Sequence, residues 1–121
     1  MTITRTEARR RVTWELDRAE LVRATALRRI RENLDTVNAA DRVLLDAKAL
    51  ATASAGIRMY GEAVALLRGG DGDIDADDVD YWTAEAEAAE REGEQGAIAR
   101  IIECLTEPEG QWVGTGDLSV L

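Results

Sequence analysis

The stretch VLLDAKALATASAGIRMYGEAV, residues 43–64, decides the fold. Apolar or small residues recur along it in alternating steps of four and three, namely Val43, Ala47, Leu50, Ser54, Ile57, Gly61 and Val64. This a/d spacing is typical of a helix packed along another helix, and small side chains let the two backbones approach closely. We therefore predict a helix over about 41–68, with Asp41 as its N-cap and this set as an oligomer seam.

The preceding segment predicts a second helix, over about 7–37, because apolar side chains recur at helical steps from Val12 to Val37. Thr4 and Glu7 have the spacing of a capping box at its start. Only residues 38–40 separate the two helices, each about 45 Å long. So short a link favours an antiparallel hairpin, although a turn and a continuous helix both stay possible at these residues.

A third, acidic helix is expected over about 77–107, after the glycine cluster at 69–72. Gly93 and Gly96 weaken its middle, so a kink or break is expected there, and Pro108 ends it. The sequence therefore predicts an all-α helical domain at 1–107 and an extended C-terminal arm at 108–121. Because 20 residues are alanine and none is phenylalanine, a thick core is not expected. We predict a helical bundle completed by oligomerisation, most simply a dimer.

The composition excludes much chemistry. The 121 residues contain no histidine and one cysteine, Cys104. This rules out nucleophile–histidine pairs, imidazole acid–base catalysis and thiolate zinc sites. Neither EF-hand register of the acidic loop at 71–77 places glycine and glutamate correctly, and no phosphate-cradling motif is present. We predict no enzyme activity, no catalytic residue, no metal and no cofactor.

The apolar runs are too short to span a bilayer, and the start has no secretory signal. With a single thiol, this favours the cytoplasm, or the virion or host cytoplasm if a phage encodes the chain. Interleaved acids along the arginine-rich first helix make direct nucleic-acid binding unlikely on sequence grounds.

Charge is divided unequally along the chain. Residues 1–70 carry 13 basic and 9 acidic side chains, whereas residues 71–121 carry 2 and 15. The acidic helix is either neutralised by the arginine-rich first helix or exposed as a surface that imitates nucleic acid. Asp80, Glu87, Glu90 and Glu94 are the candidate residues of that acidic face.

The arm supplies a second candidate surface. Its apolar residues are Trp112, Val113, Leu118, Val120 and Leu121. Alternating apolar residues in an extended segment suit docking onto a partner, while the alternative is folding back over the chain's own bundle.

Two functions therefore compete. The first is a non-enzymatic assembly or adaptor protein, of phage or actinobacterial type, acting by protein–protein interaction as a homo-oligomer. The second is an acidic nucleic-acid mimic that inhibits a host protein.

Overall fold

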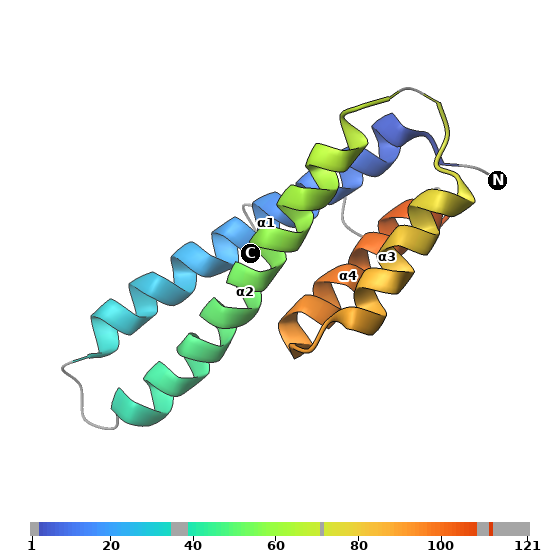
Figure 1. The fold of residues 1–121 in the computed structure, drawn as a ribbon. Coiled ribbons are helices and arrows are strands. Elements are labelled where there is room, and N and C mark those ends of the chain that lie inside the picture. Colours follow the sequence, from blue (N-terminus) through green and yellow to red (C-terminus); the bar gives the residue numbers. More distant parts are fainter. Residues whose placement is uncertain (1–2, 35–38, 71, 109–111, 113–121) are drawn as a thin grey trace.

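The computed structural model describes residues 3–34, 39–70, 72–108 and 112. Within them the chain forms four α-helices: α1 (Arg5–Asn33), α2 (Ala39–Leu67), α3 (Ala76–Ala88) and α4 (Glu92–Thr106). The all-α class is confirmed. Two long helices, α1 and α2, lie side by side, and α3 and α4 pack together against one end of them (Figure 1).

The helix boundaries differ in detail from those expected. α1 and α2 each begin two residues earlier than predicted, at Arg5 and Ala39. Asp41 therefore lies in the first turn of α2, where its charge suits the helix dipole, and the prediction that it caps the helix was wrong. α1 ends at Asn33, and the predicted extension over residues 35–37 lies outside the described residues.

The predicted third helix is two helices. The chain leaves the helical conformation at Ala89 (ψ 128°) and Arg91 (ψ 135°), so the break precedes the two glycines expected to cause it. Gly93 has a different role, because a Cβ there would lie 3.4 Å from the Cα of Thr52 and 3.3 Å from the Cβ of Ala55. The glycine therefore lets the start of α4 approach α2 closely, and it sits inside α4.

The amino terminus is tied to the loop between α2 and α3. Thr4 caps α1 by accepting a hydrogen bond from the backbone of Glu7, which is half of the expected capping box. An antiparallel bridge pairs Thr4 with Asp73, and its neighbour Ile3 accepts a backbone bond of 2.7 Å from Ile74. Gly72, at φ 98°, takes the left-handed backbone that this turn requires.

The core occupies only the end of the molecule where all four helices meet. Its members in α1 end at Ala19, and its buried members in α2 begin at Met59. The largest fully buried side chains are Arg11, Val12, Ile98, Ile101 and Cys104. Small residues bring α1 and α2 together at its edge, since a Cβ on Gly56 would lie 3.6 Å from that of Ala19.

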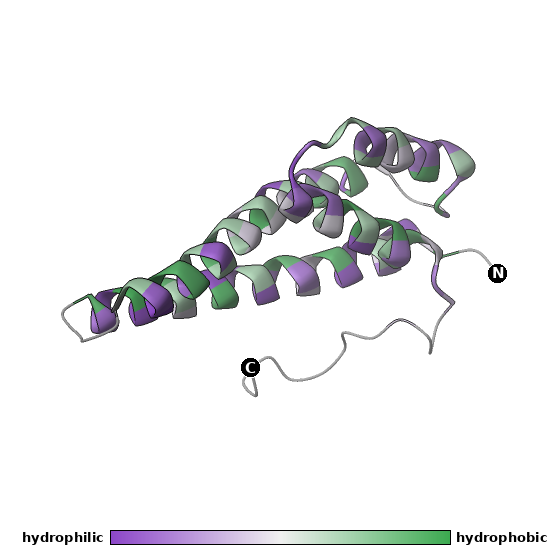
Figure 2. Ribbon diagram, turned by 90° about the horizontal axis from the view of Figure 1, so that it is seen from below, coloured by the Kyte–Doolittle hydropathy of each residue, from purple (hydrophilic) through white to green (hydrophobic). Residues whose placement is uncertain are grey.

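The other half of the α1–α2 pair has neither α3 nor α4 beside it (Figure 1). Its hydrophobic segments lie on both helices (Figure 2). Leu34, Leu44 and Leu45 are 60%, 58% and 69% exposed. This part of the chain is therefore a two-helix layer with apolar side chains in solvent.

Two glycines of α2 are expected to respond oppositely to larger side chains. A Cβ on Gly61 would meet nothing within 4 Å, so Gly61→Ala should stabilise the protein by about 0.5–1 kcal/mol through higher helix propensity. On Gly56 a Cβ would lie 3.2 Å from the Tyr60 ring, so Gly56→Leu should destabilise it by about 1–3 kcal/mol. Urea unfolding of both variants provides the measurement, and equal effects would contradict this packing.

Candidate interaction surfaces

A buried arginine joins α1 to the end of α4. Arg11 is 1% exposed, and its guanidinium donates to the backbone carbonyls of Cys104 (3.3 Å) and Glu107 (2.8 Å). Carbonyls in the last turn of a helix lack partners within the helix, so this arginine satisfies them. Glu7 supplies the opposite charge at 3.1 Å. Hydrogen bonds from Arg10 and Arg11 outweigh burial and lower the pKa of Glu7 to about 2.

A second ion pair crosses the same interface. Glu15 of α1 is 3% exposed and accepts a hydrogen bond of 2.5 Å from Arg100 of α4. Arg100 also donates to Glu103, one turn further along α4, at 2.7 Å. Burial alone would lower the pKa of Arg100, but the hydrogen bonds to Glu103 and Glu15 raise it. Arg100 therefore stays charged and lies against the buried carboxyl group of Glu15.

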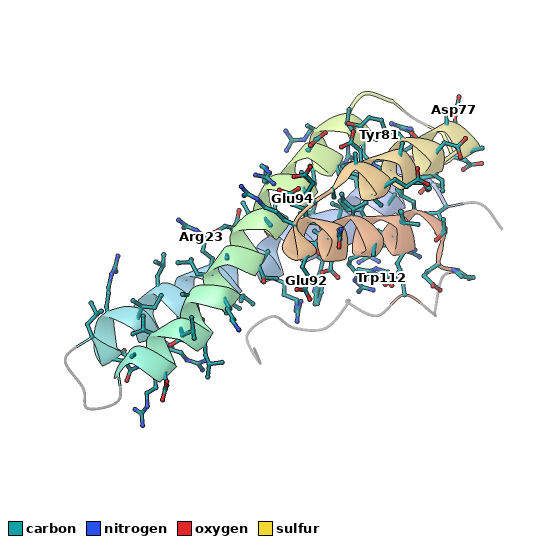
Figure 3. The ribbon with its side chains drawn as sticks, turned by 60° about the horizontal axis from the view of Figure 1, so that its bottom comes forward. Arg23, Asp77, Tyr81, Glu92, Glu94 and Trp112 are labelled. Carbon is teal, nitrogen blue, oxygen red and sulfur yellow. The ribbon has the colours of Figure 1, made fainter. Side chains whose placement is uncertain are left out.

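Trp112 closes this polar junction. It is 7% exposed, and its ring meets Trp14 edge to face, with 5.8 Å between the ring centroids. The guanidinium carbons of Arg10, Arg11 and Arg100 lie 5.7, 5.5 and 5.2 Å from its centroid. Such cation–π contacts are stabilising, and Figure 3 shows Trp112 beside α4.

The position of Trp112 corrects its place in the predicted arm. The residue packs within the chain's own bundle, because its ring lies against Trp14 and the buried Arg11, and it is 7% exposed. The other residues predicted for the arm, Val113, Leu118, Val120 and Leu121, lie outside the described residues.

Cys104 is an interior residue. Its side chain is fully buried, and burial, followed by the nearby charge of Glu15, raises its pKa to about 12. A protonated thiol without solvent access has little nucleophilic character. This cysteine contributes to packing between α4 and α1.

The predicted acidic face is only partly free. Asp80 and Glu87 of α3 are exposed, as is Glu90 in the link to α4. Glu94 instead lies in α4 and forms an ion pair with Arg58 of α2, toward which it points in Figure 3. Glu90 and Glu94 line one small depression together with Arg58 and Arg91, so Glu94 lies near the acidic face with its charge engaged by Arg58, and the four residues as one binding surface stay a prediction.

Neutralisation of α3 by α1 takes place at one end of α3. Asp75 and Asp78 cap the helix reciprocally, and Arg5 donates to Asp78 at 3.1 Å. Partial burial would raise the pKa of Asp78, but the hydrogen bonds from the Asp75 backbone and from Arg5 lower it. Further along α3, Tyr81 donates to Glu62 of α2 at 2.8 Å, which raises the pKa of Tyr81 to about 12.

The predicted seam of α2 lies beside the face that packs within the chain. The buried residues of α2 are Met59, Val64 and a line at helical spacing made by Ala53, Gly56, Tyr60, Ala63 and Leu67. Members of the seam follow these positions by one residue, or about 100° around the helix. Within the seam Val64 is buried, Val43, Leu50, Ile57 and Gly61 are partly exposed, and Ala47 and Ser54 are exposed. The seam as a contact between chains stays a prediction.

A groove that the sequence did not reveal runs between α1, α2 and the first turns of α4. Its volume is about 970 Å³, and small residues such as Ala19, Ala53 and Gly93 form much of its wall. Arg18 and Lys48 bring positive charge to it, and Glu15 and Glu92 bring negative charge. The available signal was the pair of glycines in α4, which we interpreted as helix breakers although Gly93 permits close packing.

The described residues hold no group of three or more histidine, cysteine, aspartate or glutamate side chains suited to a metal ion. None of the helices in this part of the chain combines the length and the apolar character that crossing a membrane would need. What the described geometry offers is two surfaces for contact, one apolar and one acidic.

Comparisons with protein-family models, with curated proteins and with solved structures found no match to this chain.

Breaking the buried ion pair should cost more than removing it. Arg100→Met leaves the buried carboxylate of Glu15 without its partner, so we expect a loss of about 3–5 kcal/mol in the free energy of unfolding. The double variant Glu15→Leu/Arg100→Met should recover most of this loss. Urea unfolding gives the values, with Arg58→Met at a more exposed ion pair as the control, expected to cost about 1 kcal/mol or less. Equal losses in the single and double variants would show that the charge of Glu15 is not the cause.

Proposed function

We propose that this chain is a non-enzymatic helical protein that acts by protein–protein contact, as an oligomeric component of an assembly or an adaptor. The observation that carries the proposal is the half of the α1–α2 pair without a covering layer. Leu44 and Leu45 are more than half exposed there, and Leu34 is exposed at the same end. Exposed apolar side chains that gather at one end of the molecule favour a contact surface, because leaving them in water is unfavourable.

The interior supports the same proposal. The buried ionisable residues Arg11 and Glu15 are held by ion pairs and backbone carbonyls between α1 and α4. Groups used in this way stabilise the bundle, and both side chains are at most 3% exposed. The buried charged groups therefore have structural roles, and the exposed surfaces are the better candidates for function.

The seam and the arm complete the proposal. Val43, Ala47 and Leu50 of the seam continue into the uncovered half, where a neighbouring chain has access to them. The arm would begin at Trp112, whose ring is fixed against Trp14, and its remaining residues would dock onto a neighbour. A dimer is the simplest assembly that covers the seam and the apolar residues of the arm.

Self-association should be visible directly. We expect the full chain to sediment as a dimer or larger species at micromolar concentrations, and to dissociate on dilution, because assembly follows mass action. Sedimentation equilibrium between about 1 and 200 μM covers the range of a modest interface. A fully helical monomer throughout this range would contradict the oligomeric proposal. Removal of residues 113–121, which leaves Trp112 in place, would show whether the arm contributes.

One observation favours the second function, an acidic mimic of nucleic acid. Asp80, Glu87 and Glu90 are exposed, and carboxylates in such a group can occupy the basic groove of a nucleic-acid-binding protein. This surface is separate from the exposed leucines, so the two functions predict different variants to fail.

The acidic mimic is tested with proteins of the native cell that bind heparin. The immobilised chain should retain such a protein, double-stranded DNA should displace it, and about 0.5 M salt should release it through screening. The variant Asp80→Asn/Glu87→Gln/Glu90→Gln should lose it. Glu94→Gln is the matched control, since that carboxylate is engaged with Arg58. Retention that withstands salt, DNA and the triple substitution would exclude mimicry.

A further inference from the structure

The face of the α1–α2 pair that α4 covers at one end continues without cover toward the other end. The groove beside α4 is lined in part by Val22 of α1 and Ala49 of α2. The same two residues line a second depression of about 210 Å³, which also contacts Leu21 and Arg29. The two hollows therefore form one strip, which we call the open strip, leading from α4 toward the connection between α1 and α2.

The open strip carries exposed leucines from both helices. Leu21, which lines it, is 37% exposed. Leu45 is 69% exposed and lies one helical turn before Lys48 and Ala49, which line the groove, so it extends the same face of α2. The strip thus has apolar side chains on both helices, with charged side chains such as Arg18, Asp46 and Lys48 in the same lining.

Helix lengths explain why the strip is open. α1 and α2 have 29 residues each and span about 43 Å, whereas α3 and α4, of 13 and 15 residues, span about 20 and 22 Å. About 20 Å of the long pair is left without a partner layer. A two-helix layer of about this length would cover the strip. The uncovered half of a second copy of the chain is such a layer.

Charge complements charge when the second copy is reversed. Arg29 and Asp46 lie at the outer end of the strip. Glu92 lies at its inner end, at the start of α4 (Figure 3), and Arg18 and Lys48 line the same groove. In an antiparallel pair each outer end meets the partner's inner end, which allows Arg29 to face Glu92 and Asp46 to face a basic side chain of the groove, once at each end of the interface. A parallel pair is excluded, because α4 stands on this face and would occupy the same space as its counterpart.

We propose that the open strip binds a second copy of this chain in antiparallel orientation, so that the uncovered halves form a four-helix bundle. In this dimer Arg29 of each copy faces Glu92 of the other, and Leu21 and Leu45 become buried. The interface is isologous, which closes the assembly at two copies. This inference rests on the proposed self-association and adds the surface and direction through which it occurs.

Two exposed leucines of α2 provide a matched test. Leu45→Glu places a charge in the proposed interface and should weaken dimerisation about tenfold or more by sedimentation equilibrium. Leu66→Glu introduces the same change at a residue that is 48% exposed at the covered end, and dimerisation should stay within about twofold of the unaltered chain. Far-UV circular dichroism confirms that both variants remain helical.

Charge reversal tests the orientation. Arg29→Glu should weaken dimerisation about fivefold, and Arg29→Glu/Glu92→Arg should restore it, because the reversed pair attracts again. A double variant weaker than either single variant would overturn the antiparallel arrangement.

The outcomes separate the inference from the function on which it rests. Dimerisation of the unaltered chain with equal behaviour of Leu45→Glu and Leu66→Glu would overturn the open strip and leave self-association standing. A chain that stays monomeric would overturn both. If the chain stays monomeric and Leu45→Glu abolishes its binding to a different protein, the strip is the binding site of that protein. This result would overturn the proposed dimer.

Discussion

Two helices of 29 residues cannot be covered along their whole length by helices of 13 and 15 residues. This mismatch governs the rest of the molecule. The core forms where four helices are present, and its members in α1 end at Ala19. Beyond that point each long helix has only the other one beside it among the described helices, so burial of its apolar residues is incomplete, as the exposure of Leu45 shows. Stability at this end must come from the contact between α1 and α2, or from another chain.

The covered end obtains its rigidity from polar groups as well as from apolar packing. Without phenylalanine and with many alanines, the core has few large side chains to lock α4 against α1. Arg11 and the pair of Glu15 and Arg100 supply directional contacts in their place, and Trp112 covers them. Ion pairs of this kind contribute little net stability, but a mispaired arrangement would leave charges buried without partners. The junction therefore fixes where α4 lies along α1.

Much of the secondary structure could be predicted from periodicity and breakers. The helical steps from Val12 onward and the seam spacing in α2 located both long helices within a few residues. The break between α3 and α4 was predicted at the wrong position. The prediction rested on the low helix propensity of Gly93, whereas the role of this glycine follows from its close approach to Thr52. The local sequence determines helix propensity. The need for a small side chain depends on which helix, distant in sequence, packs against that position.

The candidate surfaces were less predictable for the same reason. Nothing in the sequence marks Arg11 and Glu15 as buried, although their spacing of four places them on one face of α1. Glu94 has the spacing of an acidic row with Glu87 and Glu90, yet its partner Arg58 is far away in sequence. Trp112 follows a proline–glycine break and so resembles the start of a free arm, but three arginines and Trp14 fix it.

The excess of acid in the second half of the chain has several local uses, and these bear on the choice between the two functions. Asp77 and Asp78 lie in the first turn of α3, and Glu92 and Glu94 lie in the first turn of α4, where negative charge is stabilised by the helix dipole. Asp78 also pairs with Arg5, and Glu94 with Arg58.

After these are set aside, the carboxylates of the original acidic face that have no such role in the described structure are Asp80, Glu87 and Glu90. Three charges over two turns of helix and a link make a small imitation of a phosphate backbone, which carries a charge about every 1.7 Å. The uncovered leucines, by contrast, are exposed in the part of the chain that the structure describes. The physical argument for a contact surface is therefore stronger at the apolar end than at the acidic one.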